Sequence, residues 1–259
     1  MKEWIWGRNP VCEVLRAGKR QAFQLRLAQG VSIEGRLAEI IELAKKHSIP
    51  ISRFPKEELN GISSHHQGVV LQVAEYPYVD LDVSLDEARK LGEPPLILLL
   101  DTLQDPQNLG TLIRTAELIG VHGIVLPYRR TATVTPAVVN ASSGATEHIP
   151  ISQANLAQTI SKLKEEGLWV VGLEGSPEGQ APDQIDLTGP LVVVVGSEGQ
   201  GMRSLVKDSC DFLLRLPMRG KIDSLNAAVA GSVALYLVWQ ARGFTGAAGG
   251  ESIDGRLES

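Results

Sequence analysis

The run Leu96–Leu100, five consecutive aliphatic residues, constrains the fold of this chain more than any other stretch. A strand that is apolar at every position needs cover on both faces, which is the environment of a parallel sheet between two layers of helices. Strand-like runs recur at Gly123–Leu126, Leu168–Leu173, Leu191–Val195 and Asp211–Leu216. Helical patterns lie between them, and this alternation predicts a parallel α/β sheet.

Polar loops follow two of these strands and predict a ligand pocket, because ligands of open parallel sheets bind beyond the carboxyl ends of the strands. One loop is Gly196–Met202, and the other, after the last strand, is Pro217–Asn226. Asp223 or Ser224 is expected to cap the helix that follows and runs to Trp239. The other helical patterns of this half are Leu109–Ile119, Leu156–Glu166 and roughly Ser204–Lys207.

The first 75 residues predict a separate small α/β unit, too short for a doubly wound nucleotide-binding domain. Its expected strands are Glu3–Trp6, Phe23–Leu27, Ile49–Ile51 and Val69–Val73, and its expected helices are Asn9–Leu15, Ile33–His47 and Lys56–Leu59. Asn9 and Pro10 match the N-cap and the first position of a helix. We therefore divide the chain into a front domain (1–76), a linker with one helix at Ser84–Leu91 (77–95), a main domain (96–244) and a Gly-rich tail expected to be disordered (245–259).

The charge distribution leaves nucleic-acid binding open. The 259 residues carry a net charge of −5, which is no global sign of a polyanion partner. Residues 1–75, however, hold 11 basic against 8 acidic side chains, which leaves 14 against 22 for the rest. A basic front domain suits a polyanion, although the asymmetry is also within ordinary variation.

Cysteine usage and hydropathy exclude other classes of protein. The only cysteines, Cys12 and Cys210, have no paired spacing, which favours a reducing cytosol and argues against a cysteine-built zinc site. His65 and His66 could bind a metal or RNA, but a solvated loop is the favoured interpretation. No apolar run reaches the roughly 18 residues of a membrane span, and the N-terminus lacks the apolar core of a signal peptide.

Four side chains are candidates for chemistry, and each has a structural alternative. The loop at 196–201 has the wrong glycine order for a dinucleotide site and lacks the lysine of a P-loop. Glu198 in this loop is expected to face a cation, a hydroxyl or an arginine, or to be a helix N-terminal acid. Arg114 suits a phosphate, or is a solvated surface residue. Ser224 and Asn226 are capping residues or site residues.

Three separated motifs give the chain a resemblance to a known family. They are Asn108, Gly110, Arg114 and Thr115; the run Val195–Met202; and Leu216–Met218 followed by Ser224–Ala230. In order and spacing they resemble motifs 1, 2 and 3 of the SpoU (TrmH/RlmB) RNA ribose 2′-O-methyltransferases, and Ser142–Pro150 resembles the segment between motifs 1 and 2. The front domain, with Gly7–Val11 near its start and His66–Gly68 at its end, resembles the ribosomal-protein-like (L30e-like) RNA-binding domain of the RlmB branch.

The resemblance implies a SPOUT fold, in which the C-terminal segment threads a loop to form a deep trefoil knot. General rules of chain connection nearly exclude knots, so the element pattern alone would not suggest one. The resemblance also implies S-adenosyl-L-methionine as cofactor, an RNA substrate, a cytoplasmic homodimer with active sites near its interface, and no metal. The implied reaction is methylation of a ribose 2′-hydroxyl, with a guanosine of large-subunit (23S) ribosomal RNA as the expected target.

The motifs of the family also imply roles for residues of this sequence. The expected catalytic residues are Arg114, Asn108, Glu198, Ser224 and Asn226. Arginine is a poor base because its guanidinium stays protonated, so Arg114 is expected to hold the target phosphate and polarise the 2′-oxygen. Glu198 is expected to orient Arg114 or Asn108 by pairing with it. The expected cofactor contacts, mostly through main-chain groups, are Leu173, Gly175, Gly196, Leu216, Met218, Ser224 and Leu225.

Three other functions remain as alternatives. A tRNA ribose 2′-O-methyltransferase would share the catalytic motifs, and an RNA-binding assembly factor without catalysis would share the fold. The second is disfavoured because an inactive protein has no chemical reason to keep Asn108, Arg114, Glu198 and Asn226 together. A nicotinamide oxidoreductase is disfavoured by the glycine order of the loop at 196–201.

Overall fold

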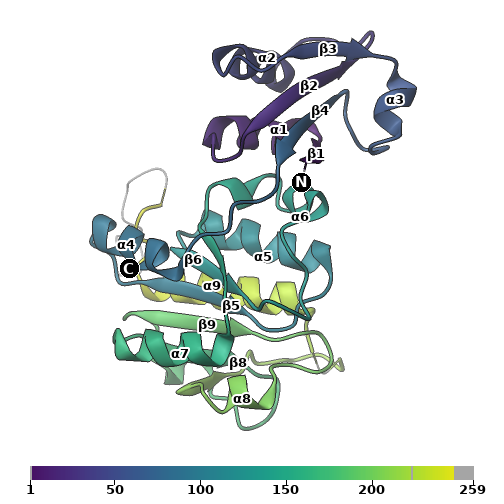
Figure 1. Ribbon diagram of the computed structural model, residues 1–259. Helices are drawn as coiled ribbons and strands as arrows, with labels where there is room; N and C mark the ends of the chain where they lie inside the picture. Colours follow the sequence, from purple (N-terminus) through teal and green to yellow (C-terminus); the bar gives the residue numbers. More distant parts are fainter. Residues whose placement is uncertain (1, 223, 248–259) are drawn as a thin grey trace, which may run out of the picture.

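The computed structural model describes residues 2–222 and 224–247. It contains a smaller sheet near the N-terminus and a larger sheet formed by later strands (Figure 1). Asp223, an expected helix cap, and residues 248–259 of the expected tail lie outside the described residues. At the start of that tail, the Thr245 carbonyl accepts a 2.9 Å hydrogen bond from the Trp239 indole. In the described part of the chain no helix is long and apolar enough to cross a membrane.

The smaller sheet is mixed and has the strand order β1-β4-β2-β3. Its elements are β1 (Lys2–Trp6), α1 (Arg8–Ala17), β2 (Ala22–Ala28), α2 (Arg36–Lys46), β3 (Ile51–Phe54), α3 (Lys56–Asn60) and β4 (Val69–Ala74). The prediction that Asn9 caps α1 is wrong, because the Gly7 carbonyl already accepts from Val11 and places Asn9 inside the helix. Strand β3 also begins where its predicted run ended, since Ile51–Phe54 is the segment that pairs with β2.

The larger sheet is parallel throughout, as the alternation of strands and helices predicted, and its strand order is β10-β8-β9-β5-β6-β7. The strands are β5 (Leu96–Leu100), β6 (Gly123–Leu126), β7 (Ile151–Gln153), β8 (Trp169–Leu173), β9 (Leu191–Val195) and β10 (Phe212–Leu214). The two most apolar strands, β5 and β9, are neighbours in the middle of the sheet, and every residue of both is buried. The short strand β7 was not predicted.

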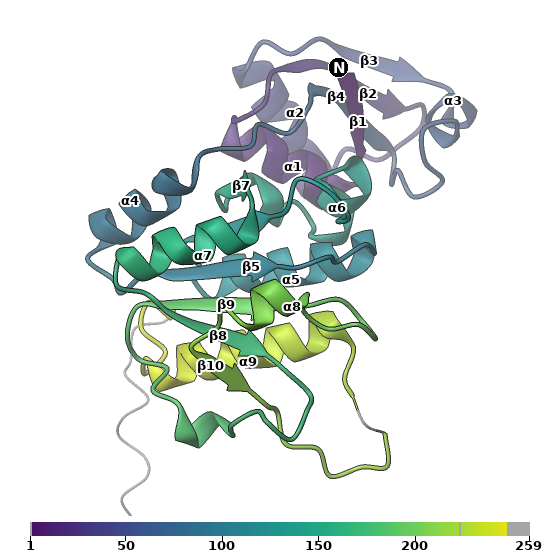
Figure 2. The same ribbon diagram turned by 60° about the horizontal axis from the view of Figure 1, so that its bottom comes forward.

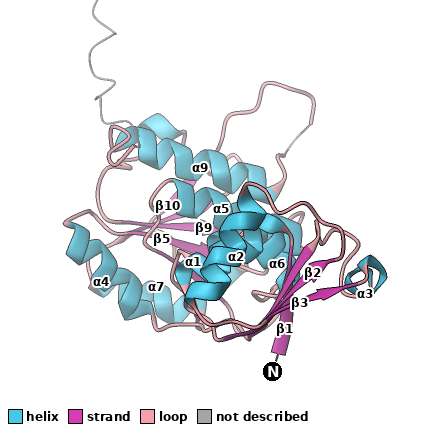
Figure 3. Cartoon of the chain, turned by 90° about the horizontal axis from the view of Figure 1, so that it is seen from above, coloured by secondary structure: helices cyan, strands magenta, loops and turns pink. Residues whose placement is uncertain are grey.

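Alternate residues of β5 face opposite layers of helices, because successive side chains of a strand point to opposite faces. Leu98 and Leu100 share a core with residues of α5 (Pro106–Leu118), α6 (Pro136–Ala141) and α9 (Ala227–Ala241). Ile97 and Leu99 share another with α4 (Leu81–Leu91), α7 (Leu156–Glu165) and α8 (Ser204–Lys207). Figure 3 shows α5 and α9 on one side of the strands and α4 and α7 on the other. The fold therefore supplies the double cover that the unbroken apolar runs require.

Buried polar contacts join the smaller sheet to the segment that follows α6, and α1 and β1 lie beside α6 (Figure 2). The Arg20 guanidinium donates hydrogen bonds of 2.7 and 3.1 Å to the Glu147 carboxylate, and neither side chain is exposed. The Tyr76 hydroxyl donates to the Thr146 carbonyl at 2.9 Å, and burial raises its pKa. Asn140 of α6 donates to a β1 carbonyl at 3.1 Å. These contacts fix the orientation of the front domain on the larger sheet.

Candidate active site

Five loops leave the same edge of the larger sheet because its strands run parallel. They follow β5, β6, β8, β9 and β10 and span residues 101–105, 127–135, 174–190, 196–203 and 215–226. The strand order places the loops after β10, β8 and β9 together at one end of this edge. It places those after β9, β5 and β6 together at the other end. The loop after β9 therefore borders both halves.

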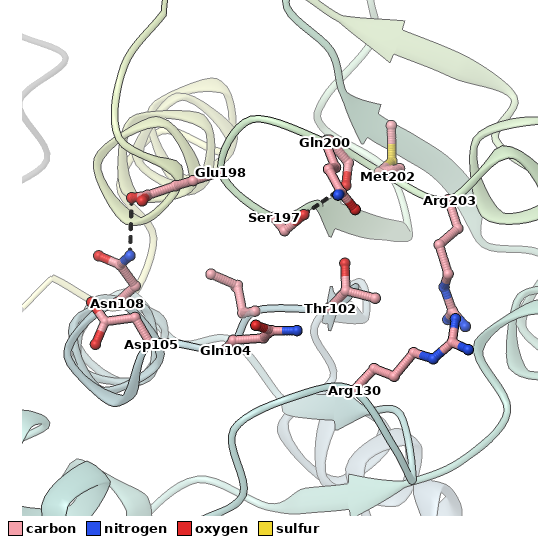
Figure 4. Close-up of a pocket in the computed structure, with 12 residues that line it drawn as sticks. Thr102, Gln104, Asp105, Asn108, Arg130, Ser197, Glu198, Gln200, Met202 and Arg203 are labelled. Carbon is pink, nitrogen blue, oxygen red and sulfur yellow. Dashed lines mark hydrogen bonds between the residues drawn. The ribbon is translucent and has the colours of Figure 1, made fainter.

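Three side chains of the expected catalytic set meet at this edge. The Asn108 amide donates a 2.9 Å hydrogen bond to Glu198 (Figure 4). The Asn226 amide donates to the Asn108 side-chain oxygen at 3.0 Å and also to the same oxygen of Glu198. Of the two partners expected for Glu198, the structure places Asn108 against it. We refer to Asn108, Glu198 and Asn226 as the amide–carboxylate cluster.

Asn226 is also the N-cap of α9. Its side-chain oxygen accepts from two backbone N–H groups of the first helical turn, at 2.9 and 3.1 Å. The cap is therefore Asn226 and not Ser224, while Asp223 lies outside the described residues. Because the amide oxygen is engaged by the helix, the amide nitrogen faces Glu198. The sequence left capping and a role in the site as alternatives for Asn226; the structure shows the cap, and the same side chain also contacts Asn108 and Glu198.

A tight turn presents Glu198 to the cluster. The backbones of Ser197 and Gly201 exchange two hydrogen bonds of 3.0 Å, and Gly199 and Gly201 have φ angles of 78° and 66°, which glycine adopts readily. A Cβ atom on Gly196 would lie 2.2 Å from the Gly201 carbonyl carbon, so a larger residue would displace the turn. The glycine order that excluded a dinucleotide site is thus the order that this turn requires.

Asn108 is held in the first turn of α5. The helix starts three residues earlier than predicted, because the Asp105 carboxylate caps it by accepting from the Gln107 N–H at 3.0 Å. Pro106 occupies the first helical position, where its missing N–H costs nothing. Asn108 therefore lies in the first turn of the helix, one residue before the predicted start at Leu109.

Arg114 lies apart from the amide–carboxylate cluster. It is six residues beyond Asn108 on α5, a rise of about 9 Å along the helix. Its side chain is exposed, and Nη1 donates a 3.2 Å hydrogen bond to the hydroxyl of Ser143. It shares a face of α5 with Leu118, which is 67% exposed. Among the described residues, Arg114 and Glu198 are not paired with each other.

The residues expected to contact the cofactor follow the three neighbouring strands β10, β8 and β9. These residues are Leu173 at the end of β8 and Gly175 after it, Gly196 after β9, and Leu216, Met218, Ser224 and Leu225 after β10. Strands β8 and β10 are tied where they end, since the Glu174 N–H donates to the Leu214 carbonyl at 3.0 Å. Leu216 is buried, whereas Met218 and Leu225 are 45% and 40% exposed. Exposed apolar side chains beside main-chain groups suit an adenine ring, so this half of the edge fits S-adenosylmethionine.

The other half of the edge contains a polar cavity of about 430 Å³ (Figure 4). Its lining is Thr102, Leu103, Gln104, Asp105, Asn108, Arg130, Ser197, Glu198, Gln200, Gly201, Met202 and Arg203. Sequence reasoning missed Thr102, Gln104, Arg130, Gln200 and Arg203. One signal was available, because two consecutive arginines, Arg129 and Arg130, follow shortly after the predicted strand Gly123–Leu126.

Burial shifts the pKa of two side chains outside the amide–carboxylate cluster. Burial raises the pKa of the Cys210 thiol to about 12, so this cysteine stays protonated at neutral pH. Burial lowers the pKa of His66, whose Nδ1 accepts a 2.8 Å hydrogen bond from the Gly68 N–H. The solvated-loop interpretation is therefore wrong for His66, which is 3% exposed. Across the described ranges, no three His, Cys, Asp or Glu residues are placed to hold a metal ion.

Comparison with protein families assigns both parts of the chain. Residues 95–236 match the family described as SpoU rRNA Methylase. Residues 4–79 match a family described as RNA 2′-O ribose methyltransferase substrate binding.

Individual relatives extend over almost the whole chain. A putative TrmH family tRNA/rRNA methyltransferase, YacO of Bacillus subtilis, is 44% identical over 93% of this chain and 96% of its own length. The SpoU methyltransferase AviRb of Streptomyces viridochromogenes, solved with AdoMet, superposes with a TM-score of 0.76 at 24% identity, covering 93% of this chain and 90% of its own. A putative RNA methyltransferase of the TrmH family from Porphyromonas gingivalis superposes with a TM-score of 0.70 at 25% identity, covering 92% of this chain and 89% of its own.

Proposed function

We propose that this chain, which belongs to the SpoU rRNA methylase family, methylates a ribose 2′-hydroxyl of RNA. It is an S-adenosylmethionine-dependent RNA methyltransferase. The choice of the 2′-oxygen is supported by the description of the family that residues 4–79 match. The amide–carboxylate cluster carries the proposal, because three loops bring the polar residues of motifs 1, 2 and 3 into direct contact at one sheet edge.

The chemical difficulty is a weakly acidic hydroxyl that must become nucleophilic at neutral pH. Bound S-adenosylmethionine supplies an electrophilic methyl group, whose transfer to the 2′-oxygen leaves S-adenosylhomocysteine and requires loss of the hydroxyl proton. Asn108 and Glu198 orient the ribose, and Asn226 with Ser224 closes the site from the third loop. Leu173, Gly175, Gly196, Leu216, Met218, Ser224 and Leu225 would hold the cofactor.

Arg114 binds the target phosphate and polarises the 2′-oxygen in this proposal, and the proton leaves to solvent. A fixed guanidinium stabilises the developing negative charge without having to accept a proton itself. Support comes from its exposure and its single 3.2 Å hydrogen bond to Ser143, which leave the side chain able to turn toward RNA.

We further propose that the enzyme is a homodimer formed through α5 and α9. Large apolar side chains are exposed on both helices: Leu118 on α5, and Val229, Val233 and Tyr236 on α9. The three on α9 are spaced by four and three residues and so share one face. Thr115 and Ser232 hydrogen-bond at 2.9 Å and join the two helices into one surface. In such a dimer Arg114 would lie at the interface.

We also propose the domain division 1–76, 77–95 and 96–244, and a trefoil knot in the last of these. The knot is supported by the path of residues 174–180, which bond to both edges of the chain at β10. At the edge facing β8 the Glu174 N–H donates to the Leu214 carbonyl at 3.0 Å. At the opposite edge the Gln180 N–H donates to the Leu213 carbonyl at 2.7 Å, and the Gln180 carbonyl accepts from the Arg215 N–H at 2.8 Å.

The proposed substrate is a guanosine of large-subunit ribosomal RNA. The resemblance of the front domain to a ribosomal-protein-like fold favours ribosomal RNA, whereas a tRNA target is the alternative, since the B. subtilis relative carries both terms in its name. A methyl-transfer assay with labelled S-adenosylmethionine on total RNA from cells lacking the protein separates the two, and mapping of the product identifies the nucleotide.

The same assay on two Arg114 variants tests the role proposed for this residue. Arg114→Ala should lower the rate of transfer by roughly 10²- to 10³-fold, the usual loss when one donor that stabilises developing charge is removed. Arg114→Lys keeps the positive charge but not the planar guanidinium, so its rate of transfer should lie between the rates of Arg114→Ala and wild type. Labelling of neither ribosomal nor transfer RNA by the wild type would refute the enzyme proposal and favour an assembly factor.

A further inference from the structure

The polar cavity at the ends of β9, β5 and β6 has two chemically different ends. Asn108, Asp105 and Glu198 lie at one end, and Arg130 and Arg203 lie at the other (Figure 4). Its volume of about 430 Å³ is within the range of small-ligand sites. The lining contains no aromatic side chain, so a ligand there is held by hydrogen bonds and charge.

The guanidinium end lacks a balancing anion. Arg203 is paired with the buried Asp101, which accepts from its backbone N–H at 2.8 Å and from its Nε at 2.7 Å. Arg130 makes no hydrogen bond or ion pair within residues 2–222 and 224–247, although it lines the same cavity. The acids at the other end are already engaged, since Asp105 caps α5 and Glu198 accepts from two amides. Two guanidinium groups at one end of the cavity, of which only Arg203 is paired with a carboxylate, form a site for a further oxyanion.

The backbone around this end is strained and held in place. Thr102 and Arg130 have φ angles of 60° and 61°, a region that a β-branched residue such as threonine rarely enters. The two loops are joined through the Leu103 carbonyl, which accepts from the Thr131 hydroxyl at 2.9 Å and from the Ala132 N–H at 2.7 Å. Strain that the surrounding structure maintains is typical of ligand sites.

We propose that this cavity holds the acceptor nucleotide of the RNA, with a phosphate between Arg130 and Arg203 and the ribose at the amide–carboxylate cluster. This inference rests on the proposed function. The residues expected to hold the cofactor lie over β10, β8 and β9, and the cavity lies over β9, β5 and β6, so the turn carrying Glu198 borders both and cofactor and acceptor can meet beside it. The amide side chains of Gln104 and Gln200 line the space between the two ends and can bond the edge of a base.

A carboxylate is the other oxyanion that this site could take, and the methionine part of the cofactor carries one. The two sources differ in what Arg130→Ala would change. Loss of a phosphate contact weakens the use of RNA, whereas loss of a carboxylate contact weakens the binding of S-adenosylmethionine.

Arg130→Ala compared with Arg129→Ala tests the proposal. Arg129 is its exposed neighbour and does not line the cavity, so its variant controls for the loss of one positive charge from the same loop. Arg130→Ala should lower kcat/KM for ribosomal RNA by roughly 10- to 100-fold, as expected for a charge-assisted hydrogen bond, and should leave the Kd for S-adenosylmethionine unchanged. Arg129→Ala should behave as wild type in both measurements.

A second measurement does not need catalysis. Phenylglyoxal modifies exposed guanidinium groups, and mass spectrometry of the modified wild type reports each arginine separately. Ribosomal RNA should protect Arg130 but not Arg129. Equal kcat/KM values for the two variants, a raised Kd for S-adenosylmethionine in Arg130→Ala, or no protection of Arg130 would each overturn the inference. If the wild type transfers no methyl group, protection still decides whether the cavity binds RNA, so the two proposals fail separately.

Discussion

Replacement of Glu147 by glutamine is expected to destabilise the protein strongly, because it removes the charge that balances a buried guanidinium. Arg20 and Glu147 have fully buried side chains and share two hydrogen bonds, of 2.7 and 3.1 Å. Glu147→Gln keeps the size and one acceptor oxygen but leaves Arg20 with Glu3 alone, at 3.3 Å. Glu3 is itself 22% exposed.

Breaking a buried pair by removing one partner costs about 3–5 kcal/mol. The remaining contact with Glu3 places the expected loss at the lower end, about 3 kcal/mol. For a chain of this length that corresponds to a fall in Tm of roughly 6–12 °C. The double variant Arg20→Met/Glu147→Leu should lose less than the single variant, since it leaves no uncompensated charge.

Urea unfolding followed both by tryptophan fluorescence and by far-UV circular dichroism would measure these changes, because two probes reveal whether the two sheets unfold together. Glu166→Gln is the matched control. Its partner Arg89 lies 2.8 Å away, but the two side chains are 41% and 59% exposed, so the loss should be below about 1 kcal/mol. A Glu147→Gln variant within about 1 kcal/mol of wild type would refute the assignment of this pair as a structural junction.

Three further predictions concern single residues of the described structure. Asn226→Ser should keep α9 capped but lose methyl transfer, while Asn226→Ala should also lose about 1 kcal/mol of stability, by urea unfolding. Gly196→Ala should abolish binding of S-adenosylmethionine in calorimetry, because the new Cβ would meet the Gly201 backbone at 2.2 Å. His66 has a lowered pKa in the fold, so its contribution to stability is complete above the ordinary histidine pKa of about 6.5 and is lost as pH falls below it. His66→Gln should remove that part of the pH dependence of Tm.

Each of these three predictions has a result that would refute it. Full methyl transfer by Asn226→Ser would show that the amide nitrogen is dispensable, leaving only the cap. Wild-type affinity of Gly196→Ala for the cofactor would mean that the turn tolerates a displaced backbone. An unchanged slope of Tm against pH in His66→Gln would assign the acid sensitivity to other groups.

Local pattern was enough to predict the sheet because the information lies within each strand. Leu96–Leu100 and Leu191–Val195 are apolar at every position, and the structure places them side by side with helices on both faces. Strand β7 escaped prediction for the opposite reason. It has three residues and exists as a strand because it pairs with β6 at the sheet edge.

The candidate site was only partly predictable because its decisive contacts are long-range. Ser224 and Asn226 are both common capping residues, and the contact that brings Asn226 to the cluster is with Asn108, 118 positions away. The only local signal for Arg130 was the consecutive pair Arg129 and Arg130, and its place beside Arg203 follows from the order of β9, β5 and β6. The resemblance to a family supplied what spacing could not, namely which polar residues to consider together.

The buried junction between Arg20 and Glu147 has a consequence for how a target would be chosen. A pocket of the front domain is lined in part by Arg8 and Lys56, and the junction keeps this pocket at a set distance from Glu198. An RNA bound at this pocket could place in the site only a nucleotide that lies at the same distance from the bound part in the folded RNA. The enzyme would then select its target nucleotide by its distance from the bound part of the RNA. An RNA with the correct local sequence but a different three-dimensional spacing would not be methylated.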